Sequence, residues 1–212
     1  MKPFIAPLAL CLALAGCGGP KPLTLPGEPV DRAATCAVVA AAEARTAAKD
    51  VQAALPLDAQ GRIVHFALLA ASAGGSFEAG TANAVNARMK ALQDEVTSGK
   101  WQALAQPCRD AFPAAWNAEP ELPKRPLDAQ LACEQLAEFM ANALGGDRSA
   151  APEVARYRTL RRTLNDRLAP ALRARVGGGF EAQQAAGRKA LAAAAELGSP
   201  VAVLDRCLTR FG

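Results

Sequence analysis

Cysteine and histidine carry the most distinctive chemistry in this chain. The 212 residues contain six cysteines and one histidine, His65. Structural zinc sites usually have ligands separated by only a few residues, and no two cysteines here are that close. His65 lies in the apolar stretch 63–68, and without a second histidine neither a zinc site nor a Ser-His-Asp centre is supported. We therefore expect His65 to be a packed helix residue, and we assign no catalytic residue, no metal site and no cofactor.

The N-terminal residues have the pattern of an export signal. Lys2 provides a positive start, and residues 4–15 form an apolar run too short to span a bilayer as a helix. The sequence Leu14-Ala15-Gly16-Cys17 resembles the lipobox of bacterial lipoproteins. The resemblance implies cleavage before Cys17, acylation of its thiol, and attachment to a membrane through that lipid anchor. Gly18 follows the cysteine, which by the same resemblance implies the periplasmic face of the outer membrane.

Segments rich in glycine and proline divide the rest of the chain. They occupy residues 17–30, as a tether, and residues 113–126, where four prolines suggest a linker, because proline disfavours the interior of helices and strands. We therefore expect a signal peptide over 1–16, the tether, a first helical repeat over 31–112, the linker, and a second helical repeat over 127–212.

The two halves look duplicated. Cys36 follows Asp31 by five residues, and Cys133 follows Asp128 by the same spacing. Residues 74–79 (GGSFEA) match 177–182 (GGGFEA), and Lys-Ala-Leu recurs at 90–92 and 189–191, a register that also aligns Cys108 with Cys207. A period near 100 residues is too long for a solenoid unit, so each copy should be a small domain or half of a pseudo-symmetric one.

The duplication selects a disulfide pairing. Cys11 would leave with the signal and Cys17 would carry lipid, and export to an oxidising compartment favours disulfides among the other four cysteines. Four cysteines allow three pairings. One bridge per repeat gives Cys36 with Cys108 and Cys133 with Cys207; free thiols or another pairing are the alternatives.

The composition predicts an all-α fold with three or four helices in each repeat. Hydrophobic residues make up 51% of the chain but aromatic residues only 5%, and good helix formers such as Ala, Leu, Arg and Glu dominate. No segment alternates as a half-buried strand would. We expect Asp31 and Asp128 to cap helix N-termini. We also expect helices to end at the Gly-Gly pairs, and one apolar stripe formed by Val154, Tyr157, Leu160, Leu164 and Leu168.

The charged residues suggest surface roles. The formal net charge of +4 does not require a nucleic-acid partner. One predicted helix carries five arginines that either form a solvated face or contact an anionic surface such as lipid head groups or envelope polymers: Arg156, Arg158, Arg161, Arg162 and Arg167. Glu78 and Glu181 each begin a predicted helix, where a carboxylate is favoured by the helix dipole.

Three hypotheses for function follow. The first is a lipid-anchored, non-enzymatic binding or structural module of the cell envelope, whose partner is an envelope protein or an anionic envelope polymer. The second is an envelope enzyme acting on cell-wall material, which a deep cleft with converging carboxylates would favour. The third is a helical domain that binds a small apolar ligand, which an apolar cavity between the repeats would favour.

Overall fold

The computed structural model describes residues 23–50 and 52–212, and within these ranges it contains helices and no strand. The all-α prediction is therefore confirmed. The first half of the chain forms α1 (Pro29–Ala47), α2 (Leu57–Ser72), α3 (Ala79–Ser98) and α4 (Ala105–Ala111). The second half forms α5 (Pro126–Ala143), α6 (Ala151–Val176), α7 (Phe180–Ala195) and α8 (Pro200–Phe211). Short 3₁₀ turns occupy Trp101–Leu104, Pro113–Trp116 and Arg148–Ala150. Across the described ranges, none of the helices combines the length and apolar character needed to cross a membrane.

The prediction that Asp31 and Asp128 cap helices is wrong. Helices α1 and α5 begin at Pro29 and Pro126, whose fixed φ suits the first helical position. The two aspartates therefore lie inside the first turn, where the helix dipole still favours a carboxylate. Each also pairs with an arginine from a neighbouring helix: Asp31 with Arg88 at 2.7 Å, and Asp128 with Arg175.

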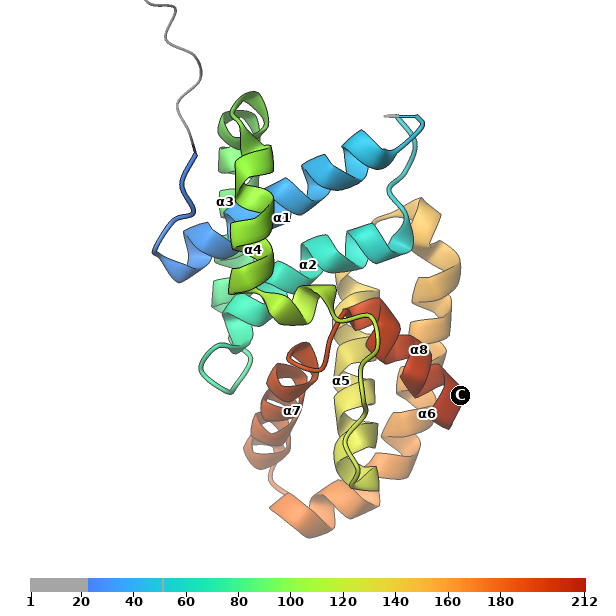
Figure 1. Ribbon diagram of the computed structural model, residues 1–212. Coiled ribbons are helices and arrows are strands. Elements are labelled where there is room, and N and C mark those ends of the chain that lie inside the picture. Colours follow the sequence, from blue (N-terminus) through green and yellow to red (C-terminus); the bar gives the residue numbers. More distant parts are fainter. Residues whose placement is uncertain (1–22, 51) are drawn as a thin grey trace, which may run out of the picture.

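Helix α6 buries the expected apolar stripe and ends at the Gly-Gly pair, as predicted. The five stripe residues are all buried, and Leu172 joins them one turn later. Pro170 lies inside the helix, where a proline removes a backbone hydrogen bond and commonly bends the axis. The helix changes direction in its last turns and ends before Gly177, which has a φ of 90° (Figure 1).

Both predicted disulfides are confirmed. Cys36 of α1 is bonded to Cys108 of α4, and Cys133 of α5 to Cys207 of α8. All four residues are buried. Each bridge thus joins the first helix of one half of the chain to the last helix of that half. This recurrence agrees with an internal duplication, which itself remains a prediction from sequence.

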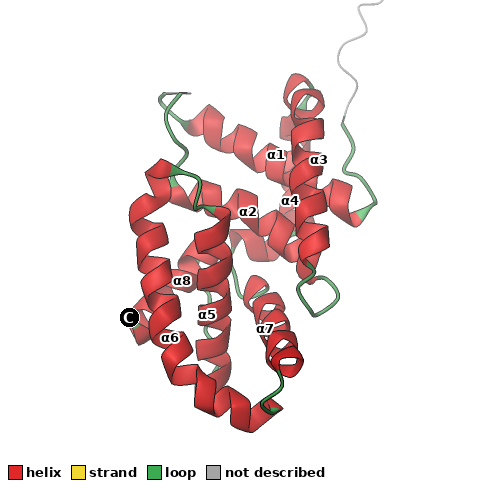
Figure 2. Ribbon diagram, turned by 180° about the vertical axis from the view of Figure 1, so that it is seen from behind, coloured by secondary structure: helices red, strands yellow, loops and turns green. Residues whose placement is uncertain are grey.

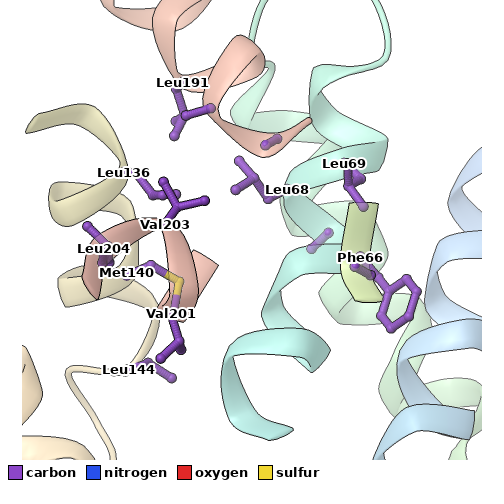
Figure 3. Packing of buried hydrophobic residues seen from close by; sticks show 14 of the residues in the cluster. Phe66, Leu68, Leu69, Leu136, Met140, Leu144, Leu191, Val201, Val203 and Leu204 are labelled. Carbon is purple, nitrogen blue, oxygen red and sulfur yellow. The ribbon is translucent and has the colours of Figure 1, made fainter. Parts of the chain in front are cut away.

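The two halves share a continuous hydrophobic core. Helices α1–α4 and α5–α8 occupy opposite ends of the molecule, and α2 packs against α7 and α8 between them (Figures 1 and 2). Gly61 of α2 permits this approach, because a Cβ at that position would lie 2.6 Å from Val201 Cγ2. Figure 3 shows side chains of α2 facing those of α5, α7 and α8, including Leu68, Leu136, Met140, Leu191 and Val203.

Residues 113–126, expected to be a linker, pack across the junction of the halves. The Trp116 ring lies between two guanidinium groups, with Arg62 Cζ 4.1 Å and Arg109 Cζ 3.8 Å from its centroid. The Asn117 side chain donates to Leu197 O at 2.8 Å, and Asn117 O accepts from Ser199 N at 2.8 Å. The segment therefore holds α2 and α4 near the start of α8.

Candidate functional site

A groove of about 920 Å³ is lined by residues from both halves of the chain. This volume lies in the range of about 300–1,000 Å³ that is usual for small-molecule sites. The groove is lined by α1, α2 and α3, with Phe139, Asn142 and Ala143 contributed by α5. It reaches the surface, because Asn83 and Asn86 of its α3 wall are exposed.

Apolar side chains form much of the groove lining. Val38 and Ala67 are buried, and Val64 and Met89 are half-buried along it. Phe77, in the loop before α3, and Phe139 of α5 meet edge to face with ring centroids 5.6 Å apart. The backbone N–H of Phe77 donates to Arg188 O of α7 at 3.1 Å, which fixes this loop against the second half.

The charged residues that line the groove are basic. Among the described lining residues these are Arg45 of α1 and Lys90 of α3, and no aspartate or glutamate is among them. The Arg45 guanidinium donates to Ala53 O, so it holds the loop after α1 that contributes Leu55 to the groove. The electrostatic character of the groove thus favours an occupant with an apolar body and a negative group.

A small hollow of about 180 Å³, here called the arginine pocket, shares one lining residue with the groove. Asn142 lines both. The other lining residues come from α5 and α6: Glu138, Ala141, Arg158, Arg161 and Arg162. Gly145 lies beside Arg158, whose Nη2 would be 3.5 Å from a Cβ at that position.

The five arginines expected on one helix are exposed on α6 and differ in their surroundings. Arg161 Nε lies 3.4 Å from Glu138 and 3.6 Å from Glu134, so this residue ties α6 to α5. Arg158 has no carboxylate partner among the described residues, and Arg162 donates to Thr159 Oγ1. Arg156 and Arg167 lie outside the arginine pocket.

A buried carboxylate lies on the other side of Arg161. Glu134 is only 5% exposed, and burial raises its pKa, opposed by the Gln135 hydrogen bond and by Arg161. Glu134 and Glu138 line a hollow of about 280 Å³ with Gln183 and Gln184. Arg161 pairs with both carboxylates, so we interpret Glu134 and Glu138 as members of a structural ion-pair network. Glu78 and Glu181 do not line any of these hollows.

His65 is buried at the contact between the halves. Its Nε2 donates to Ala195 O at 2.7 Å, which identifies the protonated nitrogen, since a carbonyl can only accept. Nδ1 is buried and has no hydrogen-bond partner in the described structure. Burial lowers the pKa of His65 to about 4, so the ring is neutral near pH 7. Its geometry supports the expected packing role.

A second groove of about 490 Å³ lies between α5, α6 and α7. Asp128 lines it together with Arg125 and Arg175, which both pair with that carboxylate. The Arg175 hydrogen bond is the main cause of the lowered pKa of Asp128. Lys189 also lines this groove, so three cationic side chains face the single carboxylate of Asp128 and the groove keeps a net positive charge.

Three further results bear on function. Within the described ranges, no cluster of three or more His, Cys, Asp or Glu side chains could hold a metal ion. The lipobox-like segment and Cys17 lie outside the described residues. Comparison with known proteins gave no matching family model, no matching curated protein and no matching solved structure.

Sequence reasoning missed the groove because its walls come from helices distant in the chain. A signal was present on α3, where Asn83, Asn86, Lys90, Gln93 and Thr97 recur at helical spacing. That pattern indicates a polar face, but it does not show that apolar side chains from α1 and α5 lie opposite. The burial of Glu134 was also missed, since a glutamate is seldom buried unless it is paired.

Proposed function

We propose that this protein is a lipid-anchored cell-envelope protein whose folded part binds an amphiphilic small molecule in the groove between α1, α2, α3 and α5. The observation that carries the proposal is the groove of about 920 Å³, which combines an apolar lining with basic and no acidic lining residues among those described. The resemblance of residues 14–17 to a lipobox supports the location at a membrane surface.

The expected occupant is a molecule with a long apolar chain and an acidic group. Burial of its chain against Val38, Val64 and Met89 would supply about 25 cal/mol for each Å² of apolar surface removed from water. Lys90 and Arg45 give the groove a positive potential that favours the approach of an anionic amphiphile over a cationic one. The amides of Asn83 and Asn86 can hydrogen-bond polar atoms of such a ligand near the groove entrance.

Binding to the groove can be tested with N-phenyl-1-naphthylamine, a neutral apolar dye that fluoresces when water is excluded. The full chain carrying Cys17→Ser should bind it, with no acyl chain of its own to compete. Asn86→Trp places an indole over the groove from an exposed position. The indole should block roughly 60 Å² of the apolar groove surface that the dye would otherwise contact. The loss of this contact should weaken dye binding about tenfold.

Ala91→Trp is the matched control, because Ala91 is exposed on the same helix and does not line the groove. This variant should bind the dye as the parent does. Equal dye binding by Asn86→Trp and Ala91→Trp would contradict the proposed site.

The anchor has its own test. Radiolabelled palmitate supplied to expressing bacterial cells should enter the wild-type chain and should not enter Cys17→Ser. The wild-type protein should fractionate with membranes, because lipidation at Cys17 would supply more than one acyl chain, as stable attachment requires. Equal labelling of the two chains would refute lipidation at Cys17.

A further inference from the structure

We infer that the arginine pocket binds the head group of the amphiphile, and that this head group is a phosphate monoester. The inference rests on the proposed function, since the groove would hold the chain of the same molecule. The observation behind this inference is that Asn142 lines both the groove and the arginine pocket, so the two hollows share one residue of α5.

The charge of the pocket matches a phosphate better than a neutral head. Arg158, Arg161 and Arg162 contribute three positive charges, and Glu138 contributes one negative charge. The lining residues therefore carry a net charge of about +2, or about +1 when Glu134, which pairs with Arg161, is counted as well. A phosphate monoester carries the opposite sign, about −1.5 to −2 near pH 7. Guanidinium groups also match the geometry of phosphate oxygens through paired N–H donors.

The three arginines have separate roles in this arrangement. Arg161 pairs with Glu134 and Glu138, at 3.6 and 3.4 Å, so its charge is largely balanced by carboxylates of α5. Arg158 has no carboxylate partner in the described part of the chain, and Arg162 donates to the hydroxyl group of Thr159. These two side chains supply the positive charge that the protein leaves uncompensated at the pocket.

The arrangement also gives the ligand a direction. The phosphate would lie between α5 and α6, and the chain would run past Asn142 into the groove toward α1 and α3. A neutral ligand of the same chain length would fill the groove and leave the pocket to water. The pocket therefore sets head-group preference, whereas the groove supplies affinity for the chain.

The test compares two ligands of equal chain length, dodecyl phosphate and dodecanol, as competitors of the neutral dye on the full chain with Cys17→Ser. Dodecyl phosphate should displace the dye at about tenfold lower concentration than dodecanol does. That ratio corresponds to the combined free energy of two modest charge interactions, with Arg158 and Arg162. Raising the salt concentration should narrow that difference, because exposed charges are screened.

Arg158→Gln with Arg162→Gln should remove most of the preference for dodecyl phosphate while dye and dodecanol binding stay unchanged. Arg156→Gln with Arg167→Gln removes the same charge from α6 outside the pocket and should keep the preference. The inference is overturned if the wild-type chain prefers neither competitor, or if both double variants behave alike. Failure of the groove would instead appear as unchanged dye binding in Asn86→Trp, so the two failures are distinguishable.

Discussion

At the scale of single residues, His65 couples stability to pH. The ring is neutral and donates through Nε2 to the Ala195 carbonyl, at the end of α7. Burial lowers its pKa from 6.5 to about 4, because a charged imidazolium would lose its water without gaining a counter-charge. Arg62 adds a smaller unfavourable interaction with the protonated ring.

The sign of the pH effect follows from linkage. Between pH 6.5 and pH 4 the unfolded chain binds a proton at His65 that the folded chain does not, so stability falls as pH falls. Above pH 6.5 the neutral ring contributes its full stability. The expected loss from this residue is roughly 3 kcal/mol by pH 4.

Denaturant unfolding of the wild-type chain and His65→Gln between pH 7 and pH 4 measures this effect. Glutamine retains an N–H that can reach the Ala195 carbonyl and does not titrate, so the variant should show a shallower decline of the free energy of unfolding. Parallel declines in the two chains would show that His65 is not the titrating group.

At the scale of elements, close helix contact depends on glycine in α2. Gly61 is buried against α8, where a Cβ would meet Val201 Cγ2 at 2.6 Å and Met140 Cε at 3.6 Å. Alanine is the better helix former by up to about 1 kcal/mol, but overpacking at a tight contact costs about 1–3 kcal/mol. The steric term is the larger, so Gly61→Ala should lower the free energy of unfolding by roughly 1–2 kcal/mol.

Gly80 in α3 provides the control, because no atom lies within 4 Å of a Cβ built there. Gly80→Ala should therefore raise stability by about 0.5–1 kcal/mol. Thermal unfolding monitored by circular dichroism gives both values. Stabilisation by both substitutions would mean that α2 and α8 are not packed as closely as described.

The sequence predicted the features that helical periodicity or the duplication specifies, and it missed those that depend on how the helices pack. The α6 stripe could be predicted because helical periodicity determines which residues share a face. The disulfide pairing could be predicted because Cys36 and Cys133 occupy matching positions, as do Cys108 and Cys207. The helix starts were predicted wrongly because α1 and α5 begin at Pro29 and Pro126, two residues before Asp31 and Asp128.

The groove and the arginine pocket could not be predicted by the same means. Their lining residues come from α1, α2, α3, α5 and α6, and no local pattern states which of these helices become neighbours. The basic character of α6 was visible in sequence, but the pairing of Arg161 with Glu134 and Glu138 depends on the packing of α5 against α6.

At the scale of the whole molecule, the two halves form one packed unit. Each disulfide closes a long loop, with sequence separations of 72 and 74 residues. The chain-entropy model gives about 4 kcal/mol for each bridge, a large part of a typical net stability of about 5–15 kcal/mol. The low aromatic content of 5% limits what core burial can add.

Cys36→Ser with Cys108→Ser should therefore lower stability by about 4 kcal/mol. Because α2 packs against α7 and α8, the second half should lose stability as well. Hydrogen exchange should show reduced protection in α5 as well as in α1. Unchanged protection of α5 would indicate that the halves are independent folding units.

The central claim is that the groove between α1, α2, α3 and α5 holds the chain of an amphiphile. Dodecyl phosphate with a diazirine near the end of its chain tests this most directly, by photolabelling of the full chain with Cys17→Ser and mapping of the modified peptides. Label should concentrate in α1 around Val38 and Ala42 and in α3 around Asn86 and Met89, and excess unlabelled dodecyl phosphate should remove it. Label concentrated on α7 and α8, or spread evenly over the surface, would contradict the claim.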